Sequence, residues 1–181
     1  AFHLKIPIAH VEAGLRTNDL NEPFPEEANR RLISQLSTIH FAPTKESAEN
    51  LQISNIKSRV FITGNTVIDL LLEESSKDII PSFLKNTRLD NYQLILTTFH
   101  RRENWGVNIS KICNAILEIL DKSKTALFIV PMHKNEIVRD SILKFLSNNS
   151  RIILTEPLKY DELIATMKIC HFILTDSGGI Q

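Results

Sequence analysis

Short apolar runs alternate with amphipathic stretches along most of the chain. The apolar runs are typical of buried strands in parallel sheets. They lie at 5–14, 39–42, 60–63, 93–100, 126–133, 151–158 and 171–179. Helical spacing of apolar positions predicts helices at 25–38, 44–55, 66–75, 108–122, 134–147 and 160–169. This alternation predicts an α/β fold with doubly wound parallel sheets.

Residues at the predicted helix starts support two of these helices. Pro25 suits a first helical position, and Glu26 and Glu27 complement the positive end of the helix dipole. Thr44 or Ser47 is expected to cap the following helix, because a hydroxyl oxygen can accept a free N–H of the first turn.

The length of 181 residues allows one good-sized domain or two small ones. A polar, irregular stretch covers 81–91, and a new strand–helix series begins after it. We therefore place a domain break within 65–90. The chain opens on Ala1 rather than Met and stops at Gln181 just after a glycine pair, so we expect a fragment.

Composition and charge exclude several classes of function. Lys+Arg and Asp+Glu both number 21, which argues against a surface for nucleic acid or anionic membranes. No apolar run is long enough to cross a bilayer, and no signal peptide is visible. Cys113 and Cys170 are isolated, which favours a reducing cytoplasm. Cys113 has the helical spacing of a core residue.

The loop after the first predicted strand carries the densest group of charges. Its carboxylates and guanidinium groups are Glu12, Glu26, Glu27, Arg16 and Arg30. Neighbouring carboxylates push their pKa values apart, which suits a site that moves protons. The alternative is that Glu26 and Glu27 only complement the helix dipole while Glu12 pairs with an arginine. Spacing alone leaves both interpretations open.

A second candidate site follows the 93–100 run, where His100, Arg101 and Arg102 stand together. Ligands of open α/β sheets bind beyond the carboxyl ends of the strands. Arginine forks suit phosphate oxygens, and histidine titrates near neutrality. We favour this interpretation over a solvated turn.

Further candidates follow other strands and carry weaker signals. His133 is as often structural as functional at such a position. Ser177, Gly178 and Gly179 would let backbone N–H groups approach a phosphate, although a tight turn explains them equally well. Phe99 lines a pocket or simply packs, and packing is the commoner outcome. No metal-ligand spacing and no P-loop is present, so we expect neither a metal nor a cofactor.

Five segments resemble the non-hydrolysing bacterial UDP-N-acetylglucosamine 2-epimerases, in family order and over nearly the whole chain. They are HVEAGLRTNDLNEPFPEEANR (10–30), FITGNTVID (61–69), HRREN (100–104), PMHKN (131–135) and TDSGGIQ (175–181). The resemblance implies two Rossmann-like domains in the GT-B arrangement, with the active site in the cleft between them. Residues 1–66 then end the N-terminal domain, and 67–181 form most of the C-terminal domain.

The resemblance also implies a reaction. Members of the family interconvert UDP-GlcNAc and UDP-ManNAc by eliminating UDP to 2-acetamidoglucal and adding it back, which supplies cell-surface polysaccharides. The resemblance further implies a homodimer, because family members are commonly dimers. Some bacterial members also bind a second, allosteric UDP-GlcNAc. The family's N-terminal half-domain and the paired glutamates expected after Gln181 are absent here. We therefore expect the 181-residue piece not to turn over alone.

Site residues carry over from the family motif by motif. Glu12 and Glu26 match the acidic residues assigned to proton transfer, and His100 matches the histidine beside the diphosphate. The resemblance implies substrate binding by Arg30, Glu27, Arg101, Arg102, His133, Ser177, Gly178 and Gly179, with His133 near the second UDP-GlcNAc. The chain departs from the family at Phe99, where a small residue usually precedes the histidine.

Three other functions stay open. A GT-B glycosyltransferase would also bind a UDP-sugar, but the glutamate triple with HRREN is not a transferase pattern. An inactive UDP-sugar-binding module would bind without proton exchange at C2. The hydrolysing epimerases, which release free ManNAc and UDP, match this motif order less well.

Overall fold

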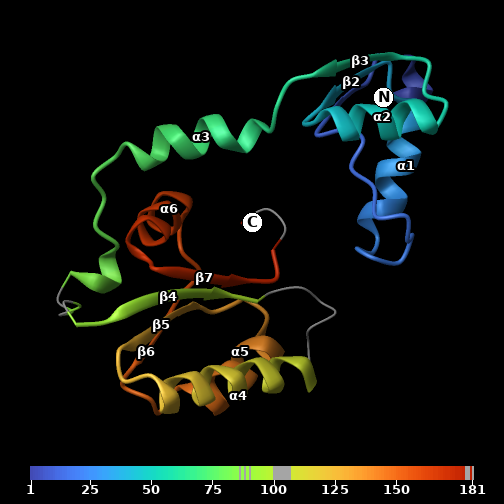
Figure 1. Cartoon of the computed structure of the whole chain (residues 1–181). Coiled ribbons are helices and arrows are strands. Elements are labelled where there is room, and N and C mark those ends of the chain that lie inside the picture. The colour runs from blue at the N-terminus through green and yellow to red at the C-terminus, as the bar shows by residue number, and fades with distance from the viewer. Residues whose placement is uncertain (86, 88, 90, 100–106, 178–179, 181) are drawn as a thin grey trace. The chain divides into compact units, whose positions relative to one another are not determined.

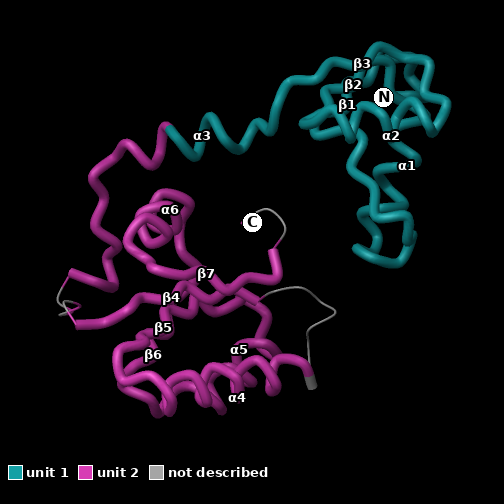
Figure 2. The backbone as a smooth tube through the Cα atoms, viewed as in Figure 1, with its two compact units in different colours: residues 1–72 teal, residues 73–181 magenta. Residues whose placement is uncertain are grey.

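A computed structural model describes residues 1–85, 87, 89, 91–99, 107–177 and 180. The chain divides into two compact units, residues 1–72 (unit 1) and residues 73–181 (unit 2), coloured separately in Figure 2. Each unit is built on its own parallel sheet. The assignment of 1–66 and 67–181 to two domains of a longer enzyme stays a prediction.

In unit 1, the described strands form a parallel sheet in the order β1-β2-β3. The elements are η1 (Phe2–Leu4), β1 (Ala9–Val11), α1 (Glu26–Leu36), β2 (Ile39–Ala42), α2 (Lys45–Ile53), β3 (Arg59–Ile62) and α3 (Thr66–Ser75). Helix α3 continues past Leu72 into unit 2. His10 of β1 is the register partner of His40 of β2.

The interior of unit 1 is notably polar. Its buried polar residues are Glu27, Ser34, Ser37, His40 and Ser47, beside the apolar Ala13, Ala42, Ala48 and Leu51. A buried polar group that lacks a hydrogen bond is costly, so these side chains need partners. A hydrogen bond of 2.8 Å, for example, joins His40 Nε2 and Ser58 Oγ.

In unit 2, the described strands form a parallel sheet in the order β6-β5-β4-β7. The elements are η2 (Ser82–Leu84), β4 (Gln93–Thr98), α4 (Val107–Lys122), β5 (Ala126–Pro131), α5 (Glu136–Leu146), β6 (Ile152–Thr155), α6 (Tyr160–Ile169) and β7 (Phe172–Thr175). The chain adds β5 and β6 on one side of β4 and then returns to add β7 on the other side. The strand order therefore reverses at β4.

Helices cover both faces of the unit 2 sheet, with α4 and α5 on one face and α6 on the other (Figure 1). Successive residues of each strand point alternately to the two faces of the sheet and pack into two apolar layers. Ile95, Phe128 and Val130 pack with α4 and α5, whereas Leu96 and Ile129 face the layer that contains residues of α6. Apolar side chains on both faces explain the nearly continuous apolar runs in the sequence. Cys113 is fully buried in the first layer, as predicted.

The predicted α/β class is confirmed, with corrections at element ends. Helix α1 begins at Glu26, so Pro25 is its N-cap residue and not the first helical residue. Thr44 caps α2, because its hydroxyl oxygen accepts the Ser47 N–H at 3.1 Å. Strands β1 and β7 are shorter than predicted, since the chain leaves each sheet early to form loops. No helix in the described part of the chain has the length and apolarity needed to span a membrane.

Candidate functional site

The chain turns sharply at Glu12, directly after β1 ends at Val11. Glu12 has a φ of 62°, a left-handed conformation that is uncommon for residues other than glycine and costs free energy. The next N–H, of Ala13, donates to the carbonyl of Phe41 at 2.9 Å and keeps the turn against β2. The side chain of Glu12 is thereby placed in solvent at the carboxyl end of the strand.

Gly14 holds this turn against helix α2. Its φ is 90°, and an added Cβ would lie 2.0 Å from the carbonyl oxygen of Ser47. Asn50 of α2 donates from Nδ2 to the Gly14 carbonyl at 3.0 Å. Only glycine allows so close an approach of the two backbones.

A buried carboxylate ties the following loop to α1. Glu27 has no exposed surface. Its Oε2 accepts the Thr17 N–H at 3.2 Å, and its Oε1 accepts Arg31 Nε at 2.9 Å. Burial by itself would raise the pKa of Glu27, but these hydrogen bonds and the charges of Arg31 and Arg16 outweigh it and hold the pKa below its ordinary value. Glu27 is therefore an ionised, fully engaged group.

Arg16 makes a second tie to α1. Its Nη2 donates to Ser34 Oγ at 3.1 Å, and Ser34 Oγ in turn donates to the Arg30 carbonyl at 2.7 Å. Burial lowers the pKa of Arg16, the charge of Glu27 opposes that effect, and the charges of Arg31 and Arg30 add to it. The guanidinium groups of Arg31 and Arg16 thus both act on the one buried carboxylate of Glu27.

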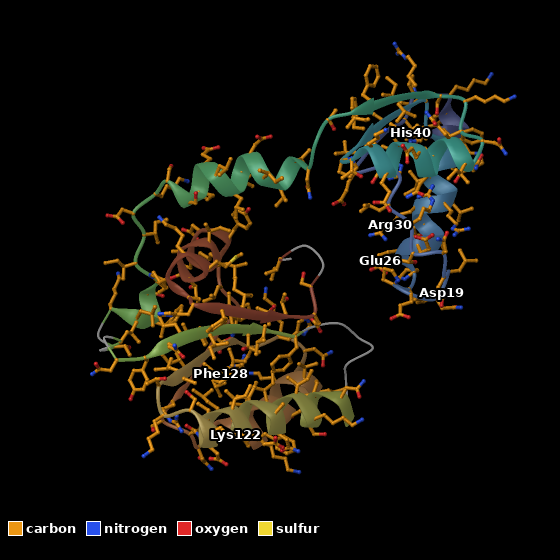
Figure 3. The ribbon with its side chains drawn as sticks, in the orientation of Figure 1. Asp19, Glu26, Arg30, His40, Lys122 and Phe128 are labelled. Atoms are coloured by element: carbon orange, nitrogen blue, oxygen red, sulfur yellow. The ribbon has the colours of Figure 1, made fainter. Side chains whose placement is uncertain are left out.

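Three other charged side chains of the same motif remain uncommitted. Within the described part of the chain, Glu12, Glu26 and Arg30 make no side-chain hydrogen bond or ion pair. The suggested pairing of Glu12 with an arginine is therefore wrong for this structure. Glu26 and Arg30 lie four residues apart and share one side of α1, where Figure 3 labels both. Two carboxylates and one guanidinium group of this motif thus have no side-chain partner among the described residues.

Two histidines adjoin this group of charges. The rings of His10 and His40 meet edge to face, with centroids 5.8 Å apart. Burial lowers the pKa of His10, and the charges of His40, Arg16 and Arg30 lower it further. Burial also lowers the pKa of His40. Both imidazoles therefore favour their neutral forms in folded unit 1.

These lowered pKa values predict that acid destabilises unit 1. Below the ordinary histidine pKa of 6.5, the unfolded chain binds protons that folded unit 1 resists, so stability falls as pH drops towards the lowered values. Hydrogen exchange of the β2 amides should show less protection at about pH 5.5 than at about pH 7.5, after correction for intrinsic rates. The His10→Asn/His40→Asn variant is the control, and an equal pH response in that variant would contradict the assignment.

Unit 2 carries a pocket of about 510 Å³. Its walls come from the segments that follow β4, β5, β6 and β7 and from α6, namely Thr98, Phe99, Pro131, Met132, His133, Lys134, Pro157, Leu158, Leu163 and Ile180. The pocket thus lies at the carboxyl edge of the sheet, beside the strand at which the order reverses. Ligands of doubly wound sheets bind at this place.

Polar groups lie in the pocket wall and beside it, and Thr98 and His133 belong to the wall. His133 Nδ1 accepts the Asn135 N–H at 3.0 Å, so Nε2 carries the proton whenever the ring is neutral. The hydroxyls of Thr98 and Thr175 lie 2.8 Å apart and join the ends of β4 and β7. The Ser177 N–H donates to Thr175 Oγ1 at 2.9 Å.

The structure locates some predicted site residues and not others. His100, Arg101, Arg102, Gly178 and Gly179 lie outside the described residues. Apart from Phe99, sequence reasoning missed the apolar pocket walls, because apolar residues carry no chemical signal of their own. The signal available was that most of them stand near the end of an apolar run. Phe99 both packs in the core and lines the pocket.

Among the described residues, no group of three or more His, Cys, Asp or Glu side chains could hold a metal ion. The site residues that the structure describes are carboxylates, arginines and histidines around loops. Side chains of these types can transfer protons and bind anions.

Comparison with known proteins identifies the family to which this chain is similar. The family model for UDP-N-acetylglucosamine 2-epimerase matches residues 1–181. The UDP-N-acetylglucosamine 2-epimerase of Neisseria meningitidis is 47% identical over 188 residues, which cover 100% of this chain and 50% of that protein. The chain spans about half the length of the curated relatives it matches.

Solved structures agree with the sequence match. A crystal structure of the N. meningitidis UDP-GlcNAc 2-epimerase bound to UDP-GlcNAc superposes with a TM-score of 0.91 at 45% identity, covering 99% of this chain and 50% of that one. A structure of S. aureus MnaA with UDP gives 0.92 at 40% identity, covering 99% and 48%. The GT-B-like, Rossmann-like fold class is thereby confirmed. The chain belongs to the UDP-N-acetylglucosamine 2-epimerase family.

Proposed function

We propose that this chain belongs to a non-hydrolysing isomerase that interconverts UDP-GlcNAc and UDP-ManNAc by inverting C2 of the sugar. The observation that carries the proposal is the division of charges in unit 1. Glu27, Arg31 and Arg16 are engaged in holding the loop, whereas the side chains of Glu12, Glu26 and Arg30 have no hydrogen-bond or ion-pair partner among the described residues. Support also comes from relatives whose structures hold UDP-GlcNAc and UDP.

The reaction needs the groups that this division leaves free. A base removes the weakly acidic C2 proton while the C1–O bond breaks, and UDP leaves with the bonding electrons to give 2-acetamidoglucal. Return of UDP to C1 and of a proton to the other face of C2 gives the epimer. We assign the two proton transfers to Glu12 and Glu26, because a separate group is needed on each face.

The departing UDP oxygen develops negative charge, which cationic groups stabilise. We assign this role to Arg30 and His100, with Arg101 and Arg102 on the phosphates. The segment 177–179 would add backbone N–H groups to the phosphates and ribose. Arg30 is suited to the role because it is half-buried and has no carboxylate partner among the described residues.

We assign the nucleotide to the pocket of unit 2. Its volume is within the range of small-ligand sites, and apolar walls such as Met132, Leu158 and Leu163 suit the faces of a uracil ring. Thr98 and His133 add polar groups at the same pocket. A second, regulatory UDP-GlcNAc beside His133 would therefore adjoin the bound nucleotide.

The resemblance supports the remaining parts of the proposal. They are a cytoplasmic homodimer that uses no cofactor and supplies UDP-ManNAc for cell-surface polysaccharides. The glycosyltransferase and the inactive binding module are disfavoured, because neither function needs the proton transfer that we assign to Glu12 and Glu26.

Proton NMR in deuterated water tests the reaction. The sample is a full-length enzyme that contains residues 1–181 and is as long as the curated relatives. It is incubated with UDP-GlcNAc. We expect UDP-ManNAc with deuterium at C2, and no turnover from residues 1–181 alone. Unchanged UDP-GlcNAc despite binding would instead indicate a transferase or a binding module. Free ManNAc and UDP would indicate the hydrolysing branch.

A further inference from the structure

We propose that Glu27 is a positioning residue, which sets the place of Glu12 relative to Glu26 and does not touch substrate. This inference rests on the proposed function and deepens it. It replaces the substrate-binding role that the family resemblance implied for Glu27.

The burial of Glu27 separates it from its sequence neighbour. Glu26 is exposed, whereas Glu27 has 0% of its surface exposed. Each carboxylate oxygen of Glu27 already accepts a hydrogen bond from the protein, one from Thr17 and one from Arg31. Its place in the first turn of α1 adds the favourable helix dipole. A ligand would have to displace these partners to reach it.

The contacts of Glu27 join the two segments that carry the free carboxylates. Thr17 belongs to the loop that begins at Glu12, and Glu27 directly follows Glu26 on α1. Arg31 extends the same tie, because its Nη2 donates to Asn18 Oδ1 at 3.3 Å. One buried group thus holds the loop and the helix together.

The other end of the loop is held independently. Gly14 is pressed against Ser47 and accepts a hydrogen bond from Asn50. Glu12 therefore stands on a segment anchored to α2 at one end and, through Glu27, to α1 at the other. Catalysis depends steeply on such placement, since a displacement of about 1 Å can cost about a hundredfold in rate.

The test compares two glutamate-to-glutamine variants in the full-length enzyme that carries this segment. Glu27→Gln keeps the size of the side chain but removes the charge that Arg31 contacts. We expect its kcat to fall at least about tenfold while its KM stays within about threefold, because positioning acts on the transition state. Glu74→Gln is the control, since Glu74 is also mostly buried and pairs with Lys77 at 2.6 Å. It should keep the wild-type kcat.

Two further measurements distinguish positioning from mere folding. The loss of kcat in the double variant Glu27→Gln/Arg31→Gln, expressed as a free energy, should be smaller than the sum of the losses in the two single variants, because both changes remove one contact. In residues 1–181, the Thr17 amide should exchange faster in Glu27→Gln than in wild type, while β2 amides keep their protection. If Glu27→Gln does not fold, Asn18→Gly replaces it. This variant removes the Arg31 contact, and glycine tolerates the φ of 65° at that position.

Several results would overturn the proposal. Wild-type kcat in Glu27→Gln, or in Asn18→Gly where that variant is used, would remove the positioning role. A KM raised about tenfold or more with kcat retained would restore direct substrate binding. If wild-type enzyme itself fails to place deuterium at C2, the proposed reaction is wrong. The Thr17 exchange measurement then still decides whether Glu27 holds the loop.

Discussion

Gly14→Ala is expected to unfold unit 1 or to cost it at least about 3 kcal/mol of stability. The added Cβ would meet the backbone oxygen of Ser47 at 2.0 Å, where a flexible side chain cannot move aside. The φ of 90° adds strain that alanine does not tolerate. Urea unfolding of residues 1–181, followed by hydrogen exchange at β2 amides, measures the loss.

Gly64→Ala is the matched control for this change. Gly64 has a similar φ of 78°, but nothing lies within 4 Å of its added Cβ. It should therefore cost only the conformational penalty of about 1 to 2 kcal/mol. Equal losses in the two variants would show that the contact with Ser47 contributes nothing and that backbone conformation explains both.

Glu12→Gln is expected to lower kcat at least about a hundredfold in a full-length enzyme that carries this segment. Glutamine has the size of glutamate but cannot take or return a proton at C2. The side chain of Glu12 is exposed and makes no polar contact in the described structure, so the fold should be unaffected. Deuterium incorporation at C2, followed by NMR over time, measures the rate.

Glu46→Gln provides the comparison, because Glu46 is an exposed glutamate at the start of α2. It should leave the rate unchanged.

His100→Ala should also lower kcat at least about a hundredfold, because it too removes a group assigned to the reacting centre. Near-normal turnover in Glu12→Gln or His100→Ala would remove that residue from the proposed site.

Local patterns determined most of the fold. The helix predicted over 66–75 is observed as Thr66–Ser75, and that over 160–169 as Tyr160–Ile169. The apolar runs of unit 2 became strands, because sheets buried on both faces need apolar side chains at successive positions. These features depend on residues a few positions apart, and the sequence contains that information directly.

The sequence also indicated which residues are candidates for the chemistry. The motif around Glu12 and Glu26 was recognisable from its charges and from its resemblance to the family, and the family match covers all 181 residues. The chemical character of a side chain does not change on folding, so a cluster of carboxylates and arginines predicts acid–base and anion chemistry before any contact is known.

Only the tertiary structure decided which of these groups are buried and hydrogen-bonded and which are exposed. Glu26 and Glu27 are identical neighbours in sequence, yet one is exposed and the other is buried against Thr17 and Arg31. The pocket of unit 2 likewise draws its walls from loops that follow four different strands. Burial and hydrogen bonding join residues far apart in the chain. These contacts distinguish the exposed carboxylates of Glu12 and Glu26 from the buried, hydrogen-bonded carboxylate of Glu27.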